Sequence, residues 1–207
     1  MEIINGLMQG FIVALTPINL FWCFVGCLLG LATAAGGGIR LDPALATLTL
    51  FFALVAHAGA NVINDVGDDI TGTDRDNVDY IHPYTGGSRF ITNGIMSVQE
   101  MHRWGWILIG MASVLGLALA LLKGPIVIAL GLAGIAIAWL YSAPAVQLSG
   151  KGVGEFFLMI AFGVLPVCGA AWLQSGVFDL GSLLIAIPVG IWVMLILWIN
   201  EVPDRKA

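Results

Sequence analysis

Long apolar segments recur along most of the chain, and they constrain its fold more than any other feature. Six of them have about the length of a membrane-crossing helix, which needs about 20 mostly apolar residues. They cover residues 9–35, 43–64, 103–122, 124–142, 153–173 and 181–200. Because lipid offers no partners for backbone groups, such segments cross a membrane as helices. The sequence therefore predicts an all-α, polytopic membrane helical bundle with about six transmembrane helices, and a lipid bilayer as its surroundings.

The composition excludes several other classes of protein. Hydrophobic residues make up 59% of the 207 residues and charged residues only 10%, whereas about 25% of the residues in a soluble domain are charged. A soluble globular domain, a disordered chain and a disulfide-rich secreted domain are therefore excluded. The chain has no basic face, so nucleic acid is not expected as a partner.

Small residues and prolines inside the apolar segments predict local features of the helices. Gly26 and Gly30 form a small-xxx-small pair, which we expect to pack against another helix of the same chain. Pro17, Pro166 and Pro188 lie inside apolar segments. In a membrane helix, prolines at such positions are expected to cause kinks and not helix ends.

Lysine and arginine residues are unevenly distributed between the two sides of the predicted bundle. The segments after the second, fourth and sixth helices contain Arg75, Arg89, Arg103, Lys151, Arg205 and Lys206. The opposite side contains only Arg40 and Lys123. Because cytoplasmic loops carry an excess of basic residues, this distribution predicts a multi-pass protein of the cell (inner or plasma) membrane. The long connection at about 65–102 is then cytoplasmic.

This long connection begins with a concentration of acidic residues. Between Asn64 and Asp79, six acids and one arginine give a charge of −5, which equals the net charge of the whole chain. On a helix, which advances 100° per residue, two amides and two carboxylates share an arc of about 100°. They are Asn61, Asn64, Asp65 and Asp68.

Carboxylates this close repel one another unless a cation neutralises them. Mg²⁺ binds through one or two carboxylates together with substrate phosphates and water. The acidic face therefore predicts a site that holds a phosphorylated substrate through Mg²⁺. The alternative is a solvated acidic loop that only caps a helix.

Further polar motifs follow on the same predicted side. The GGSR segment at 86–89 offers backbone donors and a guanidinium group to a phosphate. The YSAP segment at 141–144 and the KGVGE segment at 151–155 follow the fourth predicted helix. Near the end of the chain, Asn200 and Asp204 repeat the four-residue spacing of Asn61 and Asp65. The alternatives are that Glu155 caps a helix and that Asp204 is a charge of the tail.

Together these motifs resemble those of the UbiA superfamily of membrane prenyltransferases over residues 31–207. Asn64, Asp65 and Asp68 match the first aspartate motif of the family, and Asp74 supplies its last acid in a Gly-x-Asp variant. This variant and the segments at 77–89, 141–144 and 152–155 are similar to the branch of 1,4-dihydroxy-2-naphthoate prenyltransferases, which serve menaquinone synthesis. The segment at 200–204 resembles the start of the second aspartate motif.

The resemblance implies Mg²⁺-dependent transfer of a polyprenyl group from its diphosphate to an aromatic acceptor such as dihydroxynaphthoate. The metal ligands that it implies are Asp65, Asp68, Asp74 and Asp204. The catalytic residues are Asp65, Asp68 and Tyr141, with Tyr141 facing the allylic cation. The diphosphate-binding residues are Asn61, Asn64, Arg89, Lys151 and Asn200.

Two features depart from the family pattern. The family has nine helices and a further Asp beyond the position of Asp204, so the prenyltransferase domain at 31–207 is expected to be incomplete at its C-terminus. Residues 1–30 lack the usual Arg-Pro start and resemble the large membrane subunit of tripartite tricarboxylate transporters, so they form an atypical N-terminal helix region. The alternatives to an active enzyme are therefore a membrane transporter fragment and a catalytically inactive prenyltransferase remnant.

Overall fold

A computed structural model of the protein describes residues 17–78, 80, 88–143 and 145–204. These residues form helices and contain no strand, which confirms the predicted all-α class. The helices are α2 (Pro17–Gly36), α3 (Pro43–Thr71), α4 (Thr73–Asp76), α5 (Val98–Lys123), α6 (Ile126–Ser142), η1 (Leu148–Gly150), α7 (Gly154–Met159), η2 (Ile160–Val164), α8 (Leu165–Ser175) and α9 (Leu180–Asp204).

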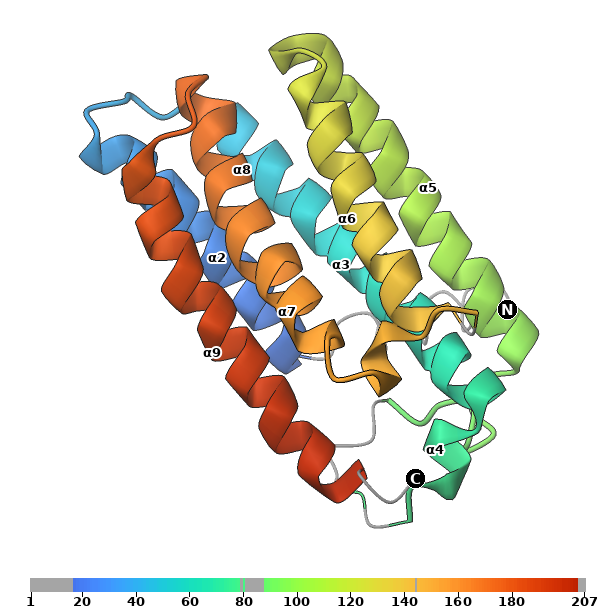
Figure 1. The fold of residues 1–207 in the computed structure, drawn as a ribbon. Helices are drawn as coiled ribbons and strands as arrows, with labels where there is room; N and C mark the ends of the chain where they lie inside the picture. Colours follow the sequence, from blue (N-terminus) through green and yellow to red (C-terminus); the bar gives the residue numbers. More distant parts are fainter. Residues whose placement is uncertain (1–16, 79, 81–87, 144, 205–207) are drawn as a thin grey trace.

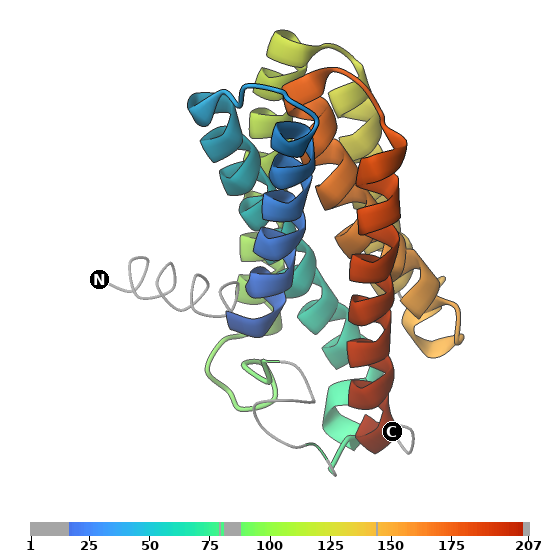
Figure 2. The same ribbon diagram turned by 90° about the vertical axis from the view of Figure 1, so that its left-hand side faces the viewer.

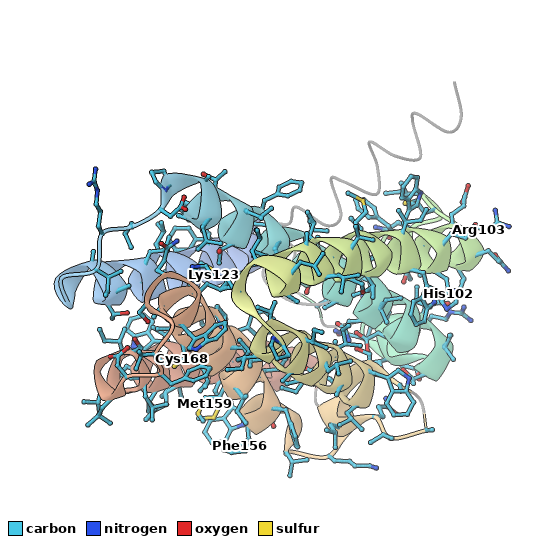
Figure 3. The ribbon with its side chains drawn as sticks, turned by 90° about the horizontal axis from the view of Figure 1, so that it is seen from above. His102, Arg103, Lys123, Phe156, Met159 and Cys168 are labelled. Carbon is cyan, nitrogen blue, oxygen red and sulfur yellow. The ribbon has the colours of Figure 1, made fainter. Side chains whose placement is uncertain are left out.

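Six of these helical segments are apolar, as the sequence predicted. In the described part of the chain, four are long and apolar enough to cross a membrane: α3, α5, the continuous helix Gly154–Ser175 and Leu180–Ile199 of α9. Cys23–Gly36 and Ile126–Ser142 are shorter apolar helices. Large apolar side chains cover their outer surface; Phe156, for example, is 54% exposed and lies at the outer edge of the bundle (Figure 3). The fold is therefore an all-α membrane bundle.

The helices run up and down an elongated bundle, so that their connections gather at its two ends (Figures 1 and 2). The α2–α3, α5–α6 and α8–α9 connections lie at one end. The opposite end, which we call the α4 end, holds α4, η1 and the last turn of α9. In both views the last turn of α9 lies at the same end of the bundle as α4. The two predicted aspartate motifs are therefore at one end of the molecule.

The structure corrects the predicted limits of the helices that flank the acidic segment. α3 continues to Thr71, beyond its predicted end at 64, and Gly72 ends it with a left-handed φ of 88°. α5 begins at Val98, before its predicted start at 103, because Ser97 and Glu100 form a capping box there. The connection predicted at 65–102 is therefore much shorter, and it contains α4.

Close contacts at glycine hold the helices together. A Cβ atom on Gly30 would lie 2.2 Å from the carbonyl oxygen of Val167, and Gly26 faces Pro166 at 3.3 Å. The predicted small-xxx-small pair of α2 therefore packs against α8 within the chain. Pro166 follows the π-helical turn η2 in a continuous helix, and Pro188 lies within the continuous helix α9, so neither proline ends its helix.

Candidate active site

The end of α3 carries the predicted acidic face. Because α3 is continuous through Thr71, the two amides and two carboxylates between residues 61 and 68 lie on one helix, as predicted. Asp65 and Asp68 are partly buried. Ser88 donates a hydrogen bond to a carboxylate oxygen of Asp65, which brings the end of the GGSR segment onto α3. The first acid of the predicted motif is therefore held by a residue 23 positions away in the sequence.

The end of α6 joins the same face through a close contact. A Cβ atom on Gly67 would lie 2.6 Å from the carbonyl oxygen of Ser142, so only glycine allows this approach of α3 to α6. Asn64 donates from Nδ2 to the Ser142 hydroxyl oxygen over 3.3 Å. This contact places Tyr141, the residue before Ser142, at the end of the site.

Arg89 holds the segment around α4. Its guanidinium group donates to the carbonyl oxygens of Asp74, at 2.7 Å, and Asn77, at 3.3 Å. The group also lies over the ring of Tyr80, 3.9 Å from the ring centroid. Arg89 is only 8% exposed and has a φ of 54°, which a residue with a side chain rarely adopts. In this arrangement Arg89 shapes the site, and its predicted contact with phosphate stays a prediction.

The acids of the −5 segment divide into two kinds. Asp69 is buried and accepts two hydrogen bonds from Arg75, at 3.1 and 3.0 Å, so a salt bridge neutralises it. Asp74 is also buried, on α4, and its negative charge acts on that of Asp65. The Asp65 and Asp74 carboxyl groups therefore interact electrostatically, and a bound cation would stabilise the charged form of both.

The donor set at the α4 end fits Mg²⁺, although the described residues contain no group of three or more His, Cys, Asp or Glu placed to hold a metal ion. Mg²⁺ needs only one or two protein carboxylates, because substrate phosphates and water complete its six oxygen ligands. Asp65 and Asp74 supply such carboxylates. Asn200 and Asp204 belong to the last turns of α9, and their side chains lie outside the described part.

A cavity of about 560 Å³ lies between the helices and reaches this face. Its wall is mostly apolar and comes from α2, α3, α5, α6, α7–α8 and α9. Asn61, Asn64 and Tyr141 are among its lining residues, whereas Lys151 is not and lies exposed after η1. The structure thus brings three of the predicted site residues to a cavity whose remaining wall suits an apolar ligand.

Three residues at this site were not assigned a role from the sequence. Ser88 binds Asp65, Ser142 binds Asn64, and His57 contacts Asn61 across 3.2 Å. The partners of Ser88 and Ser142 follow from tertiary contacts, which spacing does not predict. The position of His57 could have been predicted from the sequence, because it lies one helical turn before Asn61 on the same face of α3.

The fold and the site together define an integral membrane protein whose helices enclose an apolar cavity, with two amides of the acidic face of α3 among its lining residues. The model of the UbiA prenyltransferase family matches residues 20–207, and the chain belongs to this family. Membership confirms the predicted resemblance. Because the match begins at residue 20, it gives no support to the transporter-like interpretation of residues 1–30, of which 1–16 lie outside the described residues.

Among its relatives is the 1,4-dihydroxy-2-naphthoate octaprenyltransferase of Mycobacterium leprae, 30% identical over 159 residues, which are 77% of this chain and 52% of the relative. The Escherichia coli protein of the same name is 29% identical over 205 residues, 96% of this chain and 64% of the relative. The UbiA prenyltransferase domain-containing protein 1 of Gallus gallus is 26% identical over 200 residues, 95% of this chain and 57% of the relative. The chain thus spans a little over half the length of these relatives. No solved structure matches it significantly.

Proposed function

We propose that this protein is a membrane prenyltransferase that moves a polyprenyl group from its diphosphate to an aromatic acceptor such as dihydroxynaphthoate, in the biosynthesis of menaquinone or a related quinone. The observation that carries this proposal is the apolar cavity of about 560 Å³ that reaches the acidic face of α3 at Asn61 and Asn64. A polyprenyl diphosphate matches these two parts of the site, because its tail is apolar and its diphosphate head is charged. The naphthoate acceptor is favoured by the names of the bacterial relatives.

Mg²⁺ is the proposed cofactor, held by Asp65, Asp68, Asp74 and Asp204. When bound, it would neutralise the diphosphate oxygens and stabilise the leaving group. The proposal is supported by the electrostatic interaction between the neighbouring Asp65 and Asp74 carboxyl groups and by the position of the end of α9 at the same end of the bundle as α4 (Figures 1 and 2).

The reaction breaks the C–O bond between the prenyl group and diphosphate, forms a C–C bond to the ring, and releases diphosphate and a ring proton. The ring of Tyr141 lines the cavity and would stabilise the allylic cation through its π face. The apolar wall excludes water, which would otherwise capture this cation. Asn64, Lys151 and Asn200 are the proposed contacts of the diphosphate, whereas Arg89 holds the backbone around α4.

We also propose that the protein lies in the cell membrane with its α4 end in the cytoplasm. Arg75, Arg89, Arg103 and Lys151 belong to this end, whereas Arg40 and Lys123 belong to the opposite end. This distribution supports the orientation, because cytoplasmic segments carry the excess of basic residues.

Substitution of Asp65 tests the proposed function. In the protein reconstituted in nanodiscs, Asp65→Asn should lower kcat for Mg²⁺-dependent prenyl transfer about 100-fold or more, the usual effect of removing one electrostatic contact with the transition state. Asp76→Asn is the matched control, because Asp76 is an exposed acid of the same segment. It should keep activity within about twofold.

Two results would contradict these proposals. Full activity in Asp65→Asn, with Mg²⁺ still required, would remove Asp65 from the metal site. A wild-type protein that transfers no prenyl group to any hydroxylated aromatic acceptor would overturn the proposed function itself.

A further inference from the structure

A polar pair interrupts the apolar wall of the cavity. His57 is only 6% exposed, yet it lines the cavity beside Asn61, and the His57 Nε2 and Asn61 Nδ2 atoms are 3.2 Å apart. The ring of Phe162 meets the imidazole edge-on, with the ring centroids 4.7 Å apart. A polar residue buried at membrane depth is costly and by default marks a functional site.

The hydrogen bond within the pair determines what it offers a ligand. The amide nitrogen of Asn61 only donates, so Nε2 of His57 accepts and Nδ1 carries the proton. Among the hydrogen bonds of the described residues, this contact is the one that the His57 and Asn61 side chains make, so Nδ1 of His57 and Oδ1 of Asn61 are left for a ligand in the cavity. The pair thus offers one donor and one acceptor side by side, which is the complement of a hydroxyl group.

Two other polar residues that line the cavity, Thr49 and Ser113, do not share this property. Thr49 donates to the carbonyl oxygen of Leu45 at 2.7 Å, and Ser113 donates to that of Ile109 at 2.8 Å, so their own helices satisfy them. An isoprenoid tail has no group that could bond to His57 and Asn61, and it would leave both unpaired at a cost in free energy. The pair therefore suits the other substrate.

The position of the His57–Asn61 pair along α3 also suits the aromatic acceptor. Asn61 and His57 precede Asp65 by four and eight residues, which is about 6 and 12 Å along α3. A diphosphate bound at the carboxylates would lie nearer Asp65, which leaves the His57–Asn61 pair, deeper in the cavity, to the other substrate.

We propose that His57 and Asn61 bind a hydroxyl group of the aromatic acceptor and so select hydroxylated rings. This inference rests on the proposed prenyltransferase function, and it assigns Asn61 to the acceptor and not to the diphosphate. His57 is a substrate-positioning residue here, and it takes no proton in this role.

The experiment compares two acceptors, 1,4-dihydroxy-2-naphthoate and 1-hydroxy-2-naphthoate, which lacks one hydroxyl. In the wild-type protein the KM should be about tenfold lower for the dihydroxy acceptor, the effect of one buried hydrogen-bonded group. His57→Leu should remove this difference and leave the KM for the prenyl diphosphate unchanged. His57→Gln keeps a donor and should restore part of the difference. His57→Phe, which keeps a ring, serves as the apolar variant where His57→Leu does not fold.

Thr49→Val is the matched control, because it removes a cavity-lining hydroxyl that is already satisfied by its own helix. It should keep the tenfold preference. The inference is overturned when His57→Leu keeps the preference, when it raises the KM of the prenyl diphosphate equally, or when Thr49→Val has the same effect. A wild-type protein that transfers to neither acceptor instead overturns the proposed function, and calorimetric binding of the two acceptors then decides the inference.

Discussion

Arg89 is the residue whose role changes most between sequence and structure. Its motif predicts a phosphate contact, but its guanidinium group bonds to two backbone carbonyl groups around α4 and is almost fully buried. A left-handed φ in a residue with a side chain persists only where the surroundings impose it. We infer that Arg89 positions Asp74 within the site.

Removal of the Arg89 side chain tests this role. Hydrogen bonds from a charged group contribute about 1.5–3 kcal/mol, so Arg89→Ala should raise the exchange rate of the α4 amides about 10- to 100-fold. Hydrogen–deuterium exchange measures this rate. Arg103→Ala, which removes an exposed arginine at the start of α5, should leave exchange in α4 unchanged. Lost activity with normal exchange in α4 would favour a direct contact with phosphate instead.

Helical spacing predicted part of the site but not the hydrogen bonds between its segments. Asn64, Asp65 and Asp68 are close in the sequence, so a period of 100° per residue places them correctly. The bond from Ser88 to Asp65 depends on the path of the connection between α4 and α5, and no periodic pattern encodes that path.

At the level of the helices, hydropathy found the six apolar helices of the described residues but misplaced the end of α3 and the start of α5. Three acids between residues 65 and 69 lower the hydropathy, although the backbone stays helical until Gly72. Tertiary contacts override the local signal here: Val62 and Val66 pack in one core cluster with Met101, and Gly67 meets Ser142. Hydropathy marks where a helix leaves the apolar region, whereas capping and packing decide where it ends.

Substitution of Gly30 tests whether close contacts between helices stabilise the bundle. An added Cβ would meet the Val167 carbonyl oxygen at 2.2 Å, so Gly30→Ala must separate α2 from α8. We expect a loss of about 1–3 kcal/mol in the free energy of unfolding, typical of overpacking. Gly110→Ala is the control, because no atom lies within 4 Å of its added Cβ, and alanine should stabilise α5 by up to about 1 kcal/mol. Equal effects in an unfolding titration would contradict this interpretation.

Charge is arranged over the whole molecule so that the site and most of the basic residues share one end. Arg103 and Lys123 mark the two ends of α5, as Figure 3 shows. The acids of the site lie at the same end as Arg103, close to α4. The basic residues at this end suit the proposed diphosphate substrate, and they are also the basis of the proposed orientation in the membrane.

Labelling of cysteines at the two ends tests this orientation. Arg103 and Lys123 are both exposed, so Arg103→Cys and Lys123→Cys should each accept a membrane-impermeant maleimide from the side that they face. With the α4 end in the cytoplasm, Lys123→Cys should react in intact cells and Arg103→Cys only after permeabilisation. The unsubstituted protein is the control for Cys23, Cys27 and Cys168, of which the first two are buried. The reverse pattern would place the acidic face outside the cytoplasm, where a cytoplasmic diphosphate substrate could not reach it, and would contradict both the orientation and the supply of substrate that the proposed function requires.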